Sequence, residues 1–69
     1  MCLALPGKIK SIIKDSATVD FLGVERKASL SLVPKAKKGD YVLVHAGFAI
    51  QILEKKYAEE TIKIFKEIQ

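Results

Sequence analysis

The chain has 69 residues and a formal net charge of +4, a length that allows one small domain burying about 60% of its unfolded surface and excludes a deep substrate cleft. Its single cysteine excludes an intramolecular disulfide and favours a reducing compartment. Its apolar runs are far shorter than the roughly 18 to 20 residues of a membrane span, and its first residues lack the pattern of a signal peptide. We therefore expect a cytoplasmic protein that binds no membrane.

Short strands are expected over most of the chain, because β-branched runs and period-two alternation are bounded by turn residues. The expected strands cover residues 9–13, 17–21, 24–32, 41–45 and 48–52. In the third strand Val24, Ala28, Leu30 and Leu32 share a face, and Arg26 interrupts it, which favours a bulge or a strand end over a positioned cation. The pattern predicts a small five-stranded antiparallel barrel, which leaves no open sheet edge.

The period changes to that of a helix from about residue 54. Its apolar stripe consists of Tyr57, Ala58, Thr61, Ile62, Ile64, Phe65 and Ile68. We expect this stripe to pack on the barrel, with docking to a partner as the alternative. The chain is then a single domain, with the barrel in residues 1–53 and the C-terminal helix in residues 54–69.

Cys2 is the first candidate for chemistry, because the second residue of a chain is difficult to bury. Removal of Met1 would leave an amine beside the thiol and create a two-point metal ligand. Pro6–Gly7 is expected to restrict and turn the chain, so that the thiol sits on a short stem. The alternative is an inert cysteine that serves as a small apolar residue.

His45, the only histidine, is the second candidate. At the end of a strand it could ligate a metal, hydrogen-bond a metal-bound group or act as a base, and the alternative is a histidine bonded to a backbone carbonyl. One Cys and one His are too few for a closed four-ligand site. A metal bound here would need ligands from another protein or ligands that it already carries.

Two blocks of the sequence, residues 1–9 and residues 39–50, resemble the HypC/HupF family of hydrogenase-assembly chaperones, and residues 19–26 fit the middle of the family pattern. The resemblance implies an OB-like barrel with a C-terminal helix and a role in maturing [NiFe] hydrogenases. It implies that the protein works with the scaffold protein HypD, shares with it an iron carrying cyanide and carbon monoxide, and delivers that iron to the hydrogenase large-subunit precursor.

Carried over by position, Cys2 is the thiolate that contacts the iron or the partner's cysteine, and His45 is the matching histidine, a ligand or a neighbour of the metal. Arg26 fits the pattern without an assigned role. The residues expected to contact partners are Cys2, Leu3, Pro6, Gly7, His45, Gly47 and Phe48. The resemblance thus predicts a carrier and no enzymatic activity.

Two other functions compete with this hypothesis. The positive charge would suit an OB-like nucleic-acid-binding protein, but the lysines are scattered and most aromatic residues fall where packing in the core explains them. A thiol enzyme with Cys2 as nucleophile and His45 as base lacks a visible third residue to orient the base.

Overall fold

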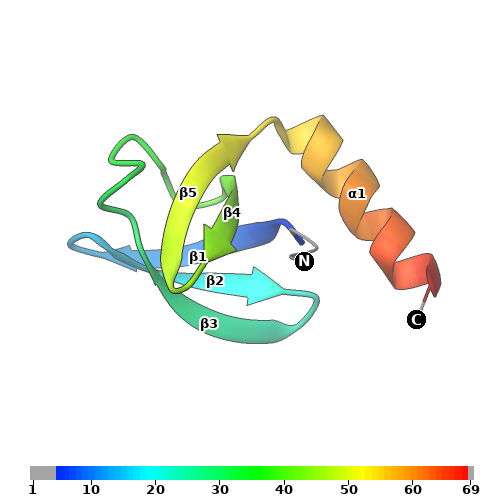
Figure 1. Cartoon of the computed structure of the whole chain (residues 1–69), viewed down its shortest axis with the longest axis horizontal. Coiled ribbons are helices and arrows are strands. Elements are labelled where there is room, and N and C mark those ends of the chain that lie inside the picture. The colour runs from blue at the N-terminus through cyan, green and yellow to red at the C-terminus, as the bar shows by residue number, and fades with distance from the viewer. Residues whose placement is uncertain (1–4, 69) are drawn as a thin grey trace.

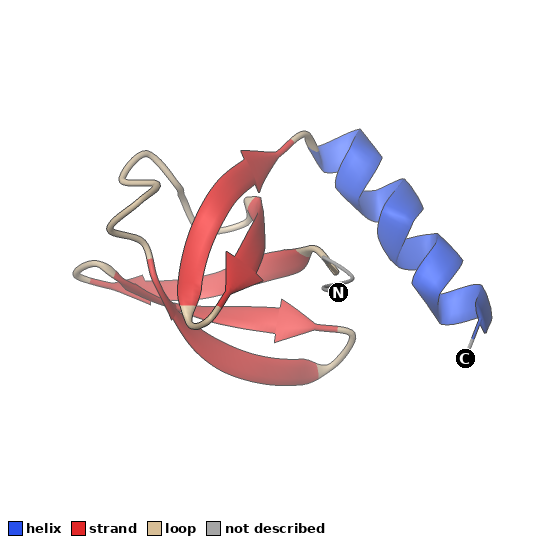
Figure 2. Cartoon of the chain, in the orientation of Figure 1, coloured by secondary structure: helices blue, strands red, loops and turns tan. Residues whose placement is uncertain are grey.

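The computed structural model describes residues 5–68, which form a small barrel followed by one helix (Figure 1). The elements are β1 (Gly7–Ile13), β2 (Ser16–Phe21), β3 (Val24–Ser29), β4 (Tyr41–His45), β5 (Phe48–Leu53) and α1 (Lys55–Ile68). The strands close in the order β1-β2-β3-β5-β4. The predicted mainly β fold is therefore confirmed, and a long loop joins β3 to β4 (Figure 2).

The sequence predicts an antiparallel barrel, but one of the five strand pairings is parallel. The pairings of β1 with β2, β1 with β4, β2 with β3 and β4 with β5 are antiparallel. β3 and β5 are parallel and are joined only at Ser29 and Phe48. The β4–β5 hairpin follows a crossing loop, and this loop brings the start of β5 to the end of β3.

β3 ends earlier than the alternation predicted. Ser29 donates its N–H to the carbonyl of Gly47 at 2.8 Å, and Leu30 donates its N–H to the carbonyl of Asp15 at 2.6 Å. The first bond joins the end of β3 to the turn before β5. The second joins the next residue to the β1–β2 turn, so the chain leaves β5 at this point and enters the loop. Leu30 is buried as expected, whereas Val24 and Leu32 are 50% and 61% exposed, so the prediction that they share the buried face is wrong.

Small and β-branched side chains fill the barrel. Its buried residues are Ile9, Ala17, Val19, Ala28, Leu30, Ala36, Val42 and Ala49. Register shifts occur in β1 between Ile9 and Ser11 and in the β4–β5 pair at Leu43 and Val44. No shift occurs at Arg26, which pairs regularly with Val19, so the bulge expected there is absent and Arg26 is an exposed residue within β3.

The helix α1 packs on the barrel only in part. Ala58 is fully buried, and Thr61, Ile62 and Phe65 are half-buried, whereas Tyr57, Ile64 and Ile68 are between 57% and 76% exposed. Figure 1 shows the helix leaving the end of β5 and running along one side of the barrel. Among residues 5–68, no helix has the length and apolar character needed to cross a bilayer.

Candidate functional site

The two blocks of the sequence that carry the family resemblance, residues 1–9 and 39–50, meet in the barrel through β1 and β4. β1 and β4 run antiparallel, with Gly7 opposite Val42 and Lys8 opposite Tyr41. Leu5 and Pro6, which precede Gly7, therefore approach the strand from the side of β4 that leads towards His45. Pro6 follows this path, because it lines a cavity of about 320 Å³ together with Leu43 of β4 and Tyr57 of α1.

Pro6 and Gly7 hold the start of β1 in place by packing. Both residues are buried, and Pro6 is among the most completely buried residues of the described chain. A Cβ atom at Gly7 would overlap Val19 and would lie 2.6 Å from Cε1 of Phe21. Gly7 begins the strand itself, so the expected turn at Pro6–Gly7 is wrong, and close packing explains the glycine instead.

His45 lies at the exposed end of β4, before a tight turn. It pairs with Phe48 across Ala46–Gly47, and both turn residues have positive φ, 54° and 84°. These are the angles of a two-residue hairpin turn of the primed type. Because Gly47 also accepts the hydrogen bond from Ser29, the turn that carries His45 and Phe48 is fixed to β3.

Of the seven residues expected to contact partners, His45, Gly47 and Phe48 lie together on the exposed turn after β4. Pro6 and Gly7 lie beside the middle of β4 and are buried, so they support the strand instead of offering a contact surface themselves. Cys2 and Leu3 lie outside the described residues, so their part in the site stays a prediction. Within residues 5–68, no group of three or more His, Cys, Asp or Glu side chains is placed to hold a metal ion.

Tyr41 of β4 links the barrel to α1. Its hydroxyl donates a part-buried hydrogen bond to the carboxylate of Glu59 at 3.4 Å. Burial raises the pKa of Tyr41 above its usual value, and the negative charge of Glu59 and the hydrogen bond add to the rise. The bond fixes the first half of the helix beside the start of β4.

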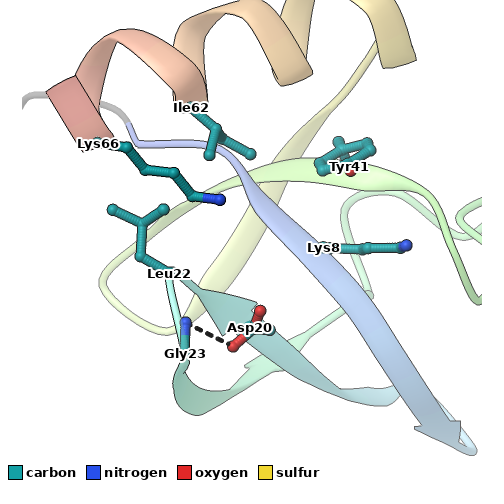
Figure 3. Close-up of a pocket in the computed structure, with 7 residues that line it drawn as sticks. All are labelled: Lys8, Asp20, Leu22, Gly23, Tyr41, Ile62 and Lys66. Atoms are coloured by element: carbon teal, nitrogen blue, oxygen red, sulfur yellow. Dashed lines mark hydrogen bonds between the residues drawn. The ribbon is translucent and has the colours of Figure 1, made fainter.

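A groove between α1 and the β2–β3 turn was not anticipated from the sequence (Figure 3). It has a volume of about 390 Å³ and is lined by Lys8, Asp20, Leu22, Gly23, Tyr41, Ile62 and Lys66. Asp20 closes the turn by accepting the N–H of Gly23 at 3.0 Å. The residues that line the groove come from distant parts of the chain, so no local sequence pattern predicted the groove.

The aromatic side chains only partly follow the sequence-based interpretation. Tyr41 is buried, and Phe21 and Phe65 are half-buried. Phe48 and Tyr57 are 45% and 58% exposed, so core packing does not account for these two residues.

Comparisons with known proteins match nearly the whole chain. A family model described as the HupF/HypC family matches residues 1–65. Hydrogenase maturation factor HypC of Synechocystis sp. is 46% identical over 68 residues, covering 90% of each chain. The factor of the same name from Cupriavidus necator is 40% identical over 70 residues, covering 100% of this chain and 78% of its own, and that of Escherichia coli K12 is 35% identical over 68 residues, covering 90% and 76%.

Proposed function

Because the chain belongs to the HupF/HypC family, we propose that it is a chaperone in the maturation of [NiFe] hydrogenases and has no enzymatic activity of its own. With HypD it binds an iron carrying cyanide and carbon monoxide through Cys2, and it delivers this cargo to the large-subunit precursor. The observation that supports this most directly is the pairing of Gly7 with Val42, which joins the start of β1 to the strand that ends at His45.

The chemistry of the cargo suits a lone thiolate. Iron that carries cyanide is a soft ion, and soft ions prefer sulfur ligands. A carrier that holds the iron by few protein bonds opposes its transfer less than a closed cage of four ligands does. The other ligands are the cyanide and carbon monoxide already on the iron and groups of HypD.

His45 is proposed to act next to Cys2. It lies three residues after Val42, the partner of Gly7, and its side chain is exposed. An exposed imidazole can ligate the iron directly or donate a hydrogen bond to a group bound to it. Phe48, which pairs with His45 across the turn, provides an exposed apolar contact for HypD or the precursor.

The experiment is anaerobic co-purification of the chain with HypD from cells that make the maturation proteins, followed by infrared spectroscopy. Wild type should show the stretching bands of iron-bound cyanide and carbon monoxide, and hydrogenase should mature. Since Cys2 is the only cysteine, Cys2→Ala removes every thiol of the chain, and we expect it to fold normally and to abolish maturation. Full maturation with Cys2→Ala, or absence of the bands from the wild-type complex, would contradict the proposal.

A second pair of variants separates the roles of His45. His45→Gln keeps a hydrogen-bond donor but weakens metal ligation, and Lys27→Gln changes another exposed residue of the barrel as a control. Displaced infrared bands in His45→Gln alone indicate that the imidazole contacts the iron or its ligands. Bands identical to those of wild type, with maturation intact, would remove His45 from the proposed site.

A further inference from the structure

One edge of β5 is unpaired along most of its length, because the barrel closes between β3 and β5 through a single residue pair. β5 pairs with β4 from Phe48 to Leu53, but it meets β3 only at the pair Ser29–Phe48. Beyond that point β3 has ended and the chain has turned into the loop. Within residues 5–68, the edge of β5 from Ala49 to Leu53 that faces away from β4 therefore has no strand partner.

Of the features that usually protect an open strand, this edge has one, a register shift that leaves Ile50 without an opposite residue on β4. Its sequence, FAIQIL, contains no charged residue, no proline and no glycine, whereas exposed edges are commonly protected by lysine, proline or inward charges. Ile50 and Ile52 are 48% and 38% exposed. An uncharged strand of this composition readily pairs with another strand. This edge is therefore a candidate surface for binding a strand of another protein.

An apolar groove lies beside the open edge. Its volume is about 390 Å³, and its lining residues are Leu32, Val33, Pro34, Lys35, Gln51 and Ile52. Four of these come from the loop after β3 and two from β5. The groove thus lies between the loop and the strand, where side chains of an added strand would find apolar contacts.

The charge around the groove favours an acidic occupant. Lys35 is the one ionisable side chain among the six lining residues. Lys37 and Lys38 follow it in the same loop, in which Asp40 is the one carboxylate and accepts the N–H of Lys37 at 2.9 Å. None of the six carries a carboxylate. A second copy of this chain would bring the same three lysines to the contact, and like charges brought together in an interface are unfavourable.

We propose that β5 and this groove bind an extended apolar segment of a partner protein that has acidic residues beside it. The segment adds to the edge of β5 as a further strand, its main chain pairs with β5, and alternate side chains enter the groove. Its acidic residues meet Lys35, Lys37 and Lys38. This surface is separate from the proposed metal site, and the proposal does not depend on the role of Cys2.

The test uses the full chain, labelled with nitrogen-15, and a capped heptapeptide of two aspartates followed by alternating valine and threonine. Two control peptides replace the aspartates by lysines or the central valine by proline. We expect the aspartate peptide to shift the amide signals of Ala49–Leu53 and of residues 32–35, and to bind at least about tenfold more tightly than either control, a difference of about 1.4 kcal/mol.

Matched variants of the protein identify the surface. Lys35→Glu should weaken binding of the aspartate peptide and improve binding of the lysine peptide, whereas Lys56→Glu, the same charge change at an exposed helix position, should alter neither. No shift of β5 signals at about 1 mM aspartate peptide, or equal binding of all three peptides, would overturn the proposal. Concentration-dependent shifts of β5 without peptide, with a dimer in sedimentation, would overturn it in favour of self-association.

Discussion

Because the side chain of Gly7 is a single hydrogen atom, the start of β1 can pack directly against Val19 and Phe21 of β2. The sequence predicts a turn at this residue, but the structure places it inside the barrel against Val19 and Phe21. Because Gly7 also pairs with Val42, its size affects both the core and the strand pairing that leads to His45. The glycine is therefore explained by packing, with no special backbone angle required.

We expect Gly7→Ala to destabilise the fold. The added methyl group has no free space and must displace Val19 or Phe21, and overpacking of this kind costs about 1 to 3 kcal/mol. Urea denaturation should show a lower midpoint with an unchanged slope. Ser11→Ala, at an exposed position of the same strand, is the control. A Gly7→Ala midpoint equal to that of wild type would mean that the barrel can accommodate a methyl group at residue 7, which would contradict the prediction.

At the scale of elements, the helix is the part least bound to the rest. Its full burial is limited to Ala58, and its described hydrogen bond to the barrel is the one from Tyr41 to Glu59. A short helix gains most of its stability from packing. We therefore expect the single hydrogen bond between Tyr41 and Glu59 to be important for holding α1 against the barrel.

The Tyr41–Glu59 contact should make stability fall at alkaline pH. The pKa of Tyr41 is raised by burial and by Glu59, whereas an unfolded tyrosine titrates near 10. Above about pH 10 the unfolded chain loses this proton first, so the stabilising contribution is complete below that pH and is lost as the pH rises towards the folded-state pKa.

Tyr41→Phe tests this contribution. Its free energy of unfolding, measured in urea between about pH 9 and pH 11.5, should decrease less with pH than that of wild type. Tyr57→Phe, which removes the hydroxyl of a tyrosine that is 58% exposed, is the matched control. Parallel curves for all three proteins would mean that Tyr41 titrates alike in the folded and unfolded states.

For the whole molecule, the net charge of +4 bears on the competing function. We expect no salt-sensitive binding of a single-stranded oligonucleotide at physiological ionic strength, because the lysines are spread over the chain. The groove that contains Lys8 and Lys66 also contains Asp20, and its aromatic residue, Tyr41, is buried and cannot stack on a base. Fluorescence anisotropy with labelled oligothymidine measures such binding. Tight binding that weakens as salt is raised, and that is lost in Phe48→Ala, would favour the nucleic-acid function instead.

The sequence predicted those parts of the fold that depend on neighbouring residues. The strand at residues 41–45 and the helix starting near residue 54 follow from local alternation and period, and they agree with β4 and with α1 at Lys55. The early end of β3 depends on bonds from Ser29 and Leu30 to distant carbonyls. No local pattern carries that information.

The same distinction applies to the site. The position of His45 at the end of a strand followed from its neighbours, whereas the burial of Gly7 and the unpaired edge of β5 depend on which strands meet. Register shifts in β1 and in the β4–β5 pair also reverse the alternation of side chains. For this reason the exposure of Ile13, Ile50 and Ile52 could not be derived from a simple two-residue period.

The antiparallel pairing of β1 with β4 has a consequence for the newly made chain. β1 and β2 can form a hairpin early, but Gly7 has no partner on its other side until Val42 has been synthesised. Closing so long a loop carries an entropic cost that hairpins avoid. The first strand translated is thus among the last to be enclosed, so the barrel closes only after almost two thirds of the chain has been made.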